Sequence, residues 1–188
     1  MSLSEYLGQS AAVIEAARDA IGEEVMDRAV EAVCTALAQG KPFLVCGNGG
    51  SAADAMHITG ELVGRFLQER RPYRAICLSS NTAVITAWAN DYSYDEVFAR
   101  QVEAYGEPGA VLLGLSTSGN AKNVTAAFEQ ARRMGMTVIA MTGEGGGAMG
   151  PLADHLLAAP SRSTPLIQQT HLCLYHYLCA RIECRMMA

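Results

Sequence analysis

Apolar residues along this chain occur either in helical stripes or in short unbroken runs, and the two patterns alternate. Residues 2–20 and 23–39 have apolar positions three or four apart, which predicts two leading helices with Gly40 just past the second. Unbroken apolar runs predict buried strands at 42–46, 74–79, 110–115, 136–141 and 156–159. The other segments predicted to be helical are 51–66, 82–89, 94–105, 121–134 and 164–185. Pro165 suits the first turn of the last helix.

Strands that alternate with helices and are apolar on both faces form parallel sheets covered by helices on each side. The chain is therefore predicted to have an α/β fold with a doubly wound, mostly parallel five-stranded sheet. Its 188 residues suit a single domain, with 1–40 as a helical N-terminal extension of the same unit. Ligands bind beyond the carboxyl ends of such strands, so the loops that follow the strands are the first candidates for a site.

Composition and charge narrow the classes of partner. A hydrophobic fraction of 50% and a charged fraction of 18% are typical of a globular protein. The net charge of −5 argues against a nucleic-acid partner, which needs a basic face. No basic leader or apolar run of about 18 residues is present, so we expect a cytoplasmic protein with no membrane partner. The six cysteines show no C-x-x-C spacing, and we expect them to be reduced and buried.

A glycine-rich loop, Gly47-Asn48-Gly49-Gly50-Ser51, follows the first strand and opens a helix. It is neither a dinucleotide-binding G-x-G-x-x-G fingerprint nor a Walker A motif, because no Gly-Lys-Ser/Thr follows. Glycines let the backbone approach a ligand closely, and Ser51 is placed to cap the helix and to donate to a ligand oxygen. Taken alone, the loop is either a tight strand-to-helix turn or a phosphate-binding site.

A second polar loop favours the phosphate interpretation. Ser116, Thr117 and Ser118 follow the third strand, and Gly119-Asn120 then leads into a helix. Helix capping needs one hydroxyl, so three in a row indicate a ligand rich in acceptors. Hydroxyls, backbone amides and a helix N-terminus can hold a phosphate without any lysine.

His57 and Glu61 lie four residues apart on the helix that follows the first loop, so they share one face of it. The pair could bind a metal, act as an acid/base pair, or form an ordinary surface hydrogen bond. Arg65, four residues further on, could instead pair with Glu61. The spacing alone does not choose between these interpretations.

The last helix offers Gln168, His171 and His176. The two histidines point about 140° apart, so at most one of them belongs to a shared site, and spacing does not say which. Gln168 and His176 differ by about 80° and lie about 12 Å apart along the axis. His155, beside the fifth predicted strand, is expected to be structural.

Four stretches together resemble the phosphoheptose isomerases of the sugar-isomerase (SIS) domain superfamily. They are CGNGGSAADAMHITGELVGRF, Asn90-Asp91, LLGLSTSGN and IQQTHLCLYH, in an order that covers nearly the whole chain. The resemblance implies a flavodoxin-like SIS fold and the isomerisation of sedoheptulose 7-phosphate to D-glycero-D-manno-heptose 7-phosphate. That reaction leads towards the heptose of lipopolysaccharide cores. A homotetramer with sites at subunit interfaces is also implied.

The resemblance further implies roles for individual residues. Glu61 and His176 would be the catalytic acid/base pair, and one zinc ion per subunit would be held by His57, Glu61, Gln168 and His176. The implied contacts to the sugar phosphate substrate are Asn48, Gly49, Gly50, Glu61, Asn90, Asp91, Ser116, Thr117, Ser118 and Gln168, to which the loop pattern adds Ser51.

One departure and two alternatives accompany the resemblance. Ala121 stands where the family usually has a serine, so we expect somewhat weaker phosphate binding. One alternative is a non-enzymatic SIS protein that binds the replication initiator, but such proteins lack the glutamate and second histidine that Glu61 and His176 supply here. The other alternative is an isomerase of another sugar phosphate or a sugar-phosphate-sensing regulator.

Overall fold

The computed structural model describes all 188 residues and contains one five-stranded sheet in which every neighbouring pair of strands is parallel. The strand order is β2-β1-β3-β4-β5. The bounds are Phe43–Gly47 (β1), Ala75–Cys77 (β2), Val111–Ser116 (β3), Thr137–Thr142 (β4) and His155–Ala158 (β5). All five predicted strands are confirmed, and the doubly wound α/β prediction is correct.

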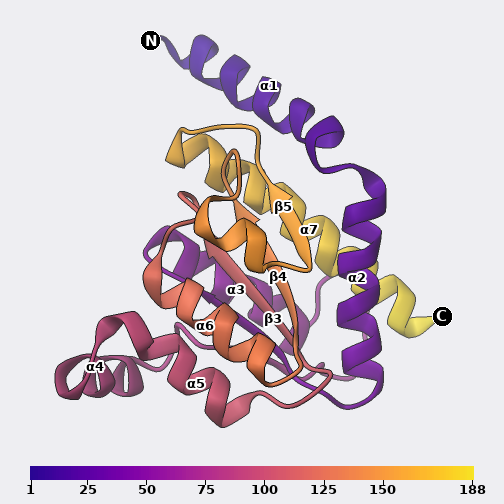
Figure 1. The fold of residues 1–188 in the computed structure, drawn as a ribbon. Helices are drawn as coiled ribbons and strands as arrows, with labels where there is room; N and C mark the ends of the chain where they lie inside the picture. The colour runs from indigo at the N-terminus through magenta and orange to yellow at the C-terminus, as the bar shows by residue number, and fades with distance from the viewer.

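Seven α-helices surround the sheet (Figure 1). They are α1 (Leu3–Ile21), α2 (Glu23–Ala38), α3 (Gly50–Val63), α4 (Thr82–Asp91), α5 (Val97–Tyr105), α6 (Lys122–Arg133) and α7 (Thr164–Met187). Two short 3-10 helices are η1 (Tyr94–Glu96) and η2 (Gly147–Leu152). The helix predicted over 94–105 is therefore divided between η1 and α5, and η2 was not predicted. Gly40 follows the C-cap residue Gln39 of α2 and has φ +73°, as expected of a glycine just past a helix.

The core lies on both faces of the sheet because strand side chains alternate between them. On β3, Val111, Leu113 and Leu115 join the cluster packed under α2, α3 and α7. Leu112 joins the opposite cluster, under α5 and α6. Gly114 allows α6 to approach β3, since a Cβ there would lie 2.4 Å from the ring of Phe128.

Helix α1 contributes little to this core and extends away from the body of the molecule, with the N-terminus at its far end (Figure 1). Only Ala17 and Ile21 near its C-terminal end are buried. Its first turn is stabilised locally by a capping box between Ser2 and Glu5. The exposed fractions of Leu3 and Leu7 are 74% and 56%, so an apolar strip of α1 faces solvent.

The cysteines were predicted to be reduced and buried, and only the first part holds for all six. All six cysteines are free thiols, but Cys173 and Cys184 on α7 are exposed. The other four are buried or partly buried. Helix α7 has one face against the sheet and one against solvent, which is why its cysteines differ in exposure. None of the helices combines the length and apolarity that spanning a membrane would require.

Candidate functional site

The first glycine-rich loop turns the chain sharply from β1 into α3. Gly49 has φ +56°, a value that favours glycine, and α3 begins at Gly50. Gly47 is also required, because a Cβ there would lie 2.6 Å from the carbonyl oxygen of Ser51. Ser51 lies inside the first helical turn with 3% of its surface exposed, and it makes no capping hydrogen bond. The prediction that Ser51 caps α3 is therefore wrong, since the flexible glycines let the helix start one residue earlier.

The side chain of Asn48 fixes this loop to its neighbours. Its Nδ2 donates to Oδ1 of Asn123 at 2.8 Å, and its Oδ1 accepts from Nδ2 of Asn123 at 2.9 Å. The hydroxyl of Tyr94 also donates to Asn48 Oδ1, at 2.8 Å. On the other side of the loop, Ser79 Oγ donates to the carbonyl oxygen of Gly47 at 2.8 Å. The Asn48 side chain thus braces the loop and leaves mainly backbone groups to face a ligand.

The second loop, 116–120, follows β3 and is supported by the segment that follows β4. Gly143 N–H donates to the carbonyl oxygen of Thr117, and Asn120 Oδ1 accepts from Ala148 N–H. A Cβ at Gly119 would lie 2.2 Å from the carbonyl oxygen of Gly146, so the two backbones touch. The run of glycines at 145–147 is what allows this close contact.

The two loops lie on adjacent parallel strands, β1 and β3, at their carboxyl ends. We call residues 47–51 and 116–120 together the loop rim. Ser116 is nearly buried and Ser118 is exposed, with their hydroxyls 3.4 Å apart. Ala121 is the N-cap residue of α6 and offers no side-chain cap, so the first N–H groups of α6 keep donor capacity beside the rim.

Helix α7 packs along α3, and the two run in the same direction. Gln168 meets Gly50 at the start of α3, whereas Glu183 meets Phe66 just past its end. We call this line of contact the α3–α7 seam. A Cβ at Gly50 would lie 2.4 Å from Nε2 of Gln168, so glycine is needed for the Gln168 amide to reach the loop rim.

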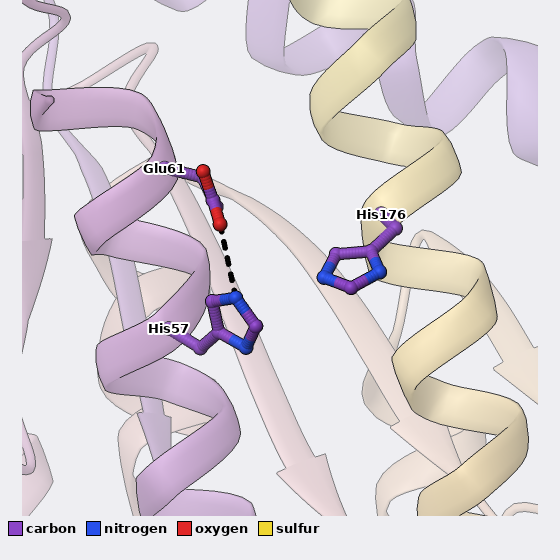
Figure 2. Close-up of side chains that lie close together, drawn as sticks. All are labelled: His57, Glu61 and His176. Carbon is purple, nitrogen blue, oxygen red and sulfur yellow. Dashed lines mark hydrogen bonds and ion pairs between the residues drawn. The ribbon is translucent and has the colours of Figure 1, made fainter. Parts of the chain in front are cut away.

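Three predicted residues meet in the middle of the seam. His57 and Glu61 of α3 face His176 of α7, as Figure 2 shows. His57 Nε2 lies 2.9 Å from Glu61 Oε1, and one donor atom from each of the three residues lies within 4.8 Å of the other two. Phe66 packs against the ring of His176 with 5.6 Å between centroids and covers one side of the cluster.

The chemistry of this donor set fits a metal ion. Two imidazole nitrogens and one carboxylate oxygen are ligands that zinc commonly takes, and three protein ligands with open positions are typical of catalytic zinc sites. His57, Glu61 and His176 could therefore hold such an ion. The side chains of His57 and Glu61 are 43% and 22% exposed, so a small ligand can reach the cluster.

Comparison with known proteins assigns the family. The SIS domain model matches residues 5–143. The phosphoheptose isomerase of Bradyrhizobium sp. strain BTAi1 is 48% identical over 186 residues, which cover 98% of this chain and 94% of that protein. That of Rhodospirillum rubrum is 50% identical over 151 residues, 80% of each chain. The chain belongs to the phosphoheptose isomerases of the SIS domain family.

A solved phosphoheptose isomerase from Neisseria gonorrhoeae has the same fold as this isomerase chain. The two superpose with a TM-score of 0.91 at 37% identity, and 97% of each chain is covered. The family and the class of enzyme expected from the four stretches are thus both confirmed.

Several predicted residues lie outside the cluster. Gln168 contacts Gly50, about 10 Å along α3 from His57, and α7 is an uninterrupted helix from Gln168 to His176. Asn90 and Asp91 are exposed at the end of α4 and bond to each other at 2.9 Å. Arg65 pairs with Glu69 at 2.9 Å, so the alternative pairing with Glu61 is not formed.

The three histidines outside α3 have different environments. His171 is fully buried and its Nε2 lies 2.9 Å from the carbonyl oxygen of Thr142. Burial lowers the pKa of His171, which keeps it neutral and structural. His155 is partly buried on β5, and burial lowers its pKa as well. Only His176 faces the cluster, because the rotation of α7 turns His171 into the core.

Sequence reasoning missed four residues that support the cluster. Asp54 and Tyr175 lie behind His57, where the Tyr175 hydroxyl is 3.0 Å from Nδ1 of His57. Arg70 and Glu183 form an ion pair at the end of the seam, with side chains 3% and 1% exposed. Arg70 Nη2 also donates to the carbonyl oxygen of Glu61 at 2.7 Å. No local pattern marks these residues, because each pair joins segments more than 100 positions apart.

Proposed function

We propose that this chain isomerises sedoheptulose 7-phosphate to D-glycero-D-manno-heptose 7-phosphate, with Glu61 and His176 as the proton-transferring residues. The observation that carries the proposal is the placement of a carboxylate–imidazole cluster beside a loop rim suited to phosphate. Gly50 at the rim lies about 10 Å along α3 from His57. A sugar phosphate could therefore span from the rim to the cluster with its carbonyl end at Glu61 and His176.

The proposed chemistry is proton transfer through an enediol. One group removes the carbon-bound proton next to the carbonyl and returns it to the neighbouring carbon, while the other moves the hydroxyl proton. Each of Glu61 and His176 has two heteroatoms, so one can face the cluster and the other the substrate. Zinc held by His57, Glu61 and His176 would supply positive charge beside the carbonyl oxygen. Exclusion of water would fall to Phe66, which covers His176.

The loop rim is proposed to bind the phosphate. Ser116, Thr117 and Ser118 would supply hydroxyls, and the backbone of Gly49 and Gly50 would supply N–H groups beside Ser51. In this proposal, Asn48 holds the rim in shape through Asn123. Gln168, whose amide lies against Gly50, would face the sugar. Asn90 and Asp91 would contact the substrate from the end of α4.

A homotetramer is proposed as the working assembly. Its support is the exposed apolar strip of α1 together with Leu172 on α7, which is 40% exposed. A second copy covering this surface would bury those side chains. Light scattering on the eluted peak of a sizing column should give four times the mass of the chain. A peak with the mass of a single chain would contradict the proposed tetramer and leave the proposed reaction unaffected.

One assay tests the function. Purified protein is incubated with sedoheptulose 7-phosphate, with and without a chelator, and the aldose product is measured. We expect product from the native chain and none from Glu61→Gln or His176→Ala, with Glu69→Gln as the control carboxylate on the exposed surface. Full turnover in both cluster variants would contradict the assignment. A parallel panel of pentose and hexose phosphates distinguishes an isomerase of another sugar phosphate, for which the product would form only with that sugar.

A further inference from the structure

Tyr175 lies directly behind the cluster and touches two polar groups at once. The residue is fully buried, and its hydroxyl is 3.0 Å from His57 Nδ1 and 3.5 Å from Asp54 Oδ1. A phenolic hydroxyl has a single proton to donate but can also accept. When His57 Nδ1 is unprotonated, both Nδ1 and Asp54 Oδ1 are acceptors, and the single Tyr175 proton can serve only one of them.

Asp54 shows the sign of an unsatisfied acceptor. Its Oδ2 is buried and has no hydrogen-bond partner, and its Oδ1 has only the long contact to Tyr175. A buried carboxylate oxygen without a donor is costly, so its retention calls for an explanation. Oδ2 stays without a donor in either case, so the bond from Tyr175 to Oδ1 is the one that the Asp54 side chain can gain, and it forms when His57 Nδ1 carries a proton. Nδ1–H then donates to the Tyr175 oxygen, and the tyrosine proton turns to Asp54.

The geometry points to a relay. We propose that Asp54 and Tyr175 hold His57 in the Nδ1-protonated tautomer, which leaves the Nε2 lone pair free to bind a metal ion at the His57–Glu61–His176 cluster. The inference rests on the proposed function of that cluster and adds two positioning residues to it. Histidine ligands of metals generally donate their other ring N–H to a protein acceptor, and here a tyrosine would pass that bond on to a carboxylate.

The relay also fixes the ring itself. His57 is on the exposed side of α3, with its side chain 43% accessible, and its packing contacts are the edges of Tyr175 and His176. Without the bond at Nδ1, the imidazole could rotate and direct Nε2 away from Glu61. Tyr175 therefore sets both the tautomer and the direction of the metal-binding nitrogen.

The test measures zinc affinity of the full-length protein, stripped of metal, by competition with a chromophoric chelator. The variants are Tyr175→Phe, Asp54→Ala and the double variant, with Tyr177→Phe as the control. Tyr177 is on the same helix, is 48% exposed and makes no contact with the cluster, so it controls for loss of a tyrosine hydroxyl on α7. Thermal unfolding of the metal-free proteins checks that each variant is folded.

We expect Tyr175→Phe and Asp54→Ala each to weaken zinc binding by about 10–100-fold, and Tyr177→Phe to leave it unchanged. Because Asp54 acts through the Tyr175 hydroxyl, the double variant should bind within about twofold of Tyr175→Phe. Losses that multiply in the double variant would show two independent structural effects and overturn the relay. Native affinity in Tyr175→Phe, or no zinc binding by the native chain, would overturn it as well.

The isomerase assay separates this inference from the proposed function. If the native chain turns over sedoheptulose 7-phosphate but Tyr175→Phe keeps native zinc affinity, the relay is wrong and the proposed function stands. A native chain that shows no turnover, while the variants lose zinc affinity as expected, supports the relay and defeats the assigned reaction. Asp54→Ala keeps the test valid if Tyr175→Phe is unstable, because Asp54 is only partly buried on α3.

Discussion

The loop rim and the α3–α7 seam contribute to one site but are built in opposite ways. The rim consists of short segments whose own residues determine their shape, such as Gly49 with its φ of +56° and Gly119 with its φ of +66°. The seam depends on side chains that meet from distant segments, as His57 and His176 do. Rim geometry therefore depends on local conformation, whereas seam geometry depends on the register between two helices.

The far end of the seam shows how that register is held. The Glu183 carboxylate accepts from the backbone N–H groups of Phe66, Leu67 and Gln68 at 3.0, 2.7 and 2.9 Å. It also accepts from Arg70 Nε at 2.9 Å. Since Arg70 holds the Glu61 carbonyl as well, this clasp of Arg70 and Glu183 ties the end of α3 to α7. The rim has no comparable buried charge.

The largest expected effect comes from breaking the clasp. Glu183→Gln leaves Arg70 as an uncompensated buried charge and should lower the free energy of unfolding by about 3–5 kcal/mol. Glu103→Gln, which removes an exposed pair with Arg100, should cost no more than about 1 kcal/mol. Urea denaturation measures both. Equal losses in the two variants would show that the clasp does not anchor the seam.

The same clasp predicts a pH dependence. Burial alone would raise the pKa of Glu183, but the N–H groups of Leu67, Phe66 and Gln68 and the charge of Arg70 outweigh it and lower the pKa below its usual 4.5. A carboxyl whose pKa is lower in the folded state stabilises the fold above its unfolded pKa and loses this contribution as the pH falls through the folded pKa. The stability gap between the native chain and Glu183→Gln should therefore narrow below pH 4.5. A gap that stays constant on acidification would contradict this.

A smaller effect is expected at the rim. Gly119→Ala places a Cβ 2.2 Å from the Gly146 carbonyl oxygen. A Cβ at Gly145, which has φ +81°, would meet nothing within 4 Å. Gly145→Ala should cost about 1–2 kcal/mol from its backbone conformation alone. Gly119→Ala should cost roughly a further 1–3 kcal/mol and raise KM for the sugar phosphate, because the rim must shift. Thermal unfolding and steady-state kinetics compare Gly119→Ala with Gly145→Ala. Equal stability and equal KM in the two variants would contradict the close contact between Gly119 and Gly146.

The smallest expected effect is a gain. Ala121 has extended backbone angles, φ −67° and ψ 112°, at the N-cap of α6. Ala121→Ser should stabilise the protein by about 1 kcal/mol by capping α6, and should lower KM by adding a hydroxyl to the rim. Ala126→Ser, in the interior of α6, is the control and should show neither gain. An unchanged KM in Ala121→Ser would place the phosphate away from the α6 N-terminus.

The same contrast explains what the sequence could predict. All five strands and both loops of the rim follow from local patterns, and the structure confirms them. The predicted start of α3 at Ser51 is one residue late, because the two preceding glycines do not fix the helix boundary. The choice between His171 and His176 depends on the rotation of α7 against the sheet, which periodicity does not contain. Family resemblance supplied that choice.

Long-range partners were beyond sequence reasoning for a related reason. Tyr175 looks like any apolar-face aromatic of α7, and Glu183 like a solvated charge near a helix end. Each acquires its role only from a segment more than 100 residues away, through His57 and Arg70 respectively. Gln168 was predicted as a fourth metal ligand, and the contact that the structure shows for its amide is with Gly50 at the loop rim.

The most direct test of the division between rim and seam is solvent exchange at saturating substrate. Sedoheptulose 7-phosphate is incubated in deuterated water, and deuterium entering the carbon next to the carbonyl is followed by NMR. The native chain and Ser118→Ala, a rim variant, should both incorporate deuterium, whereas Glu61→Gln should incorporate none above the uncatalysed rate. Incorporation by Glu61→Gln at the native rate would contradict the claim that the seam transfers the proton.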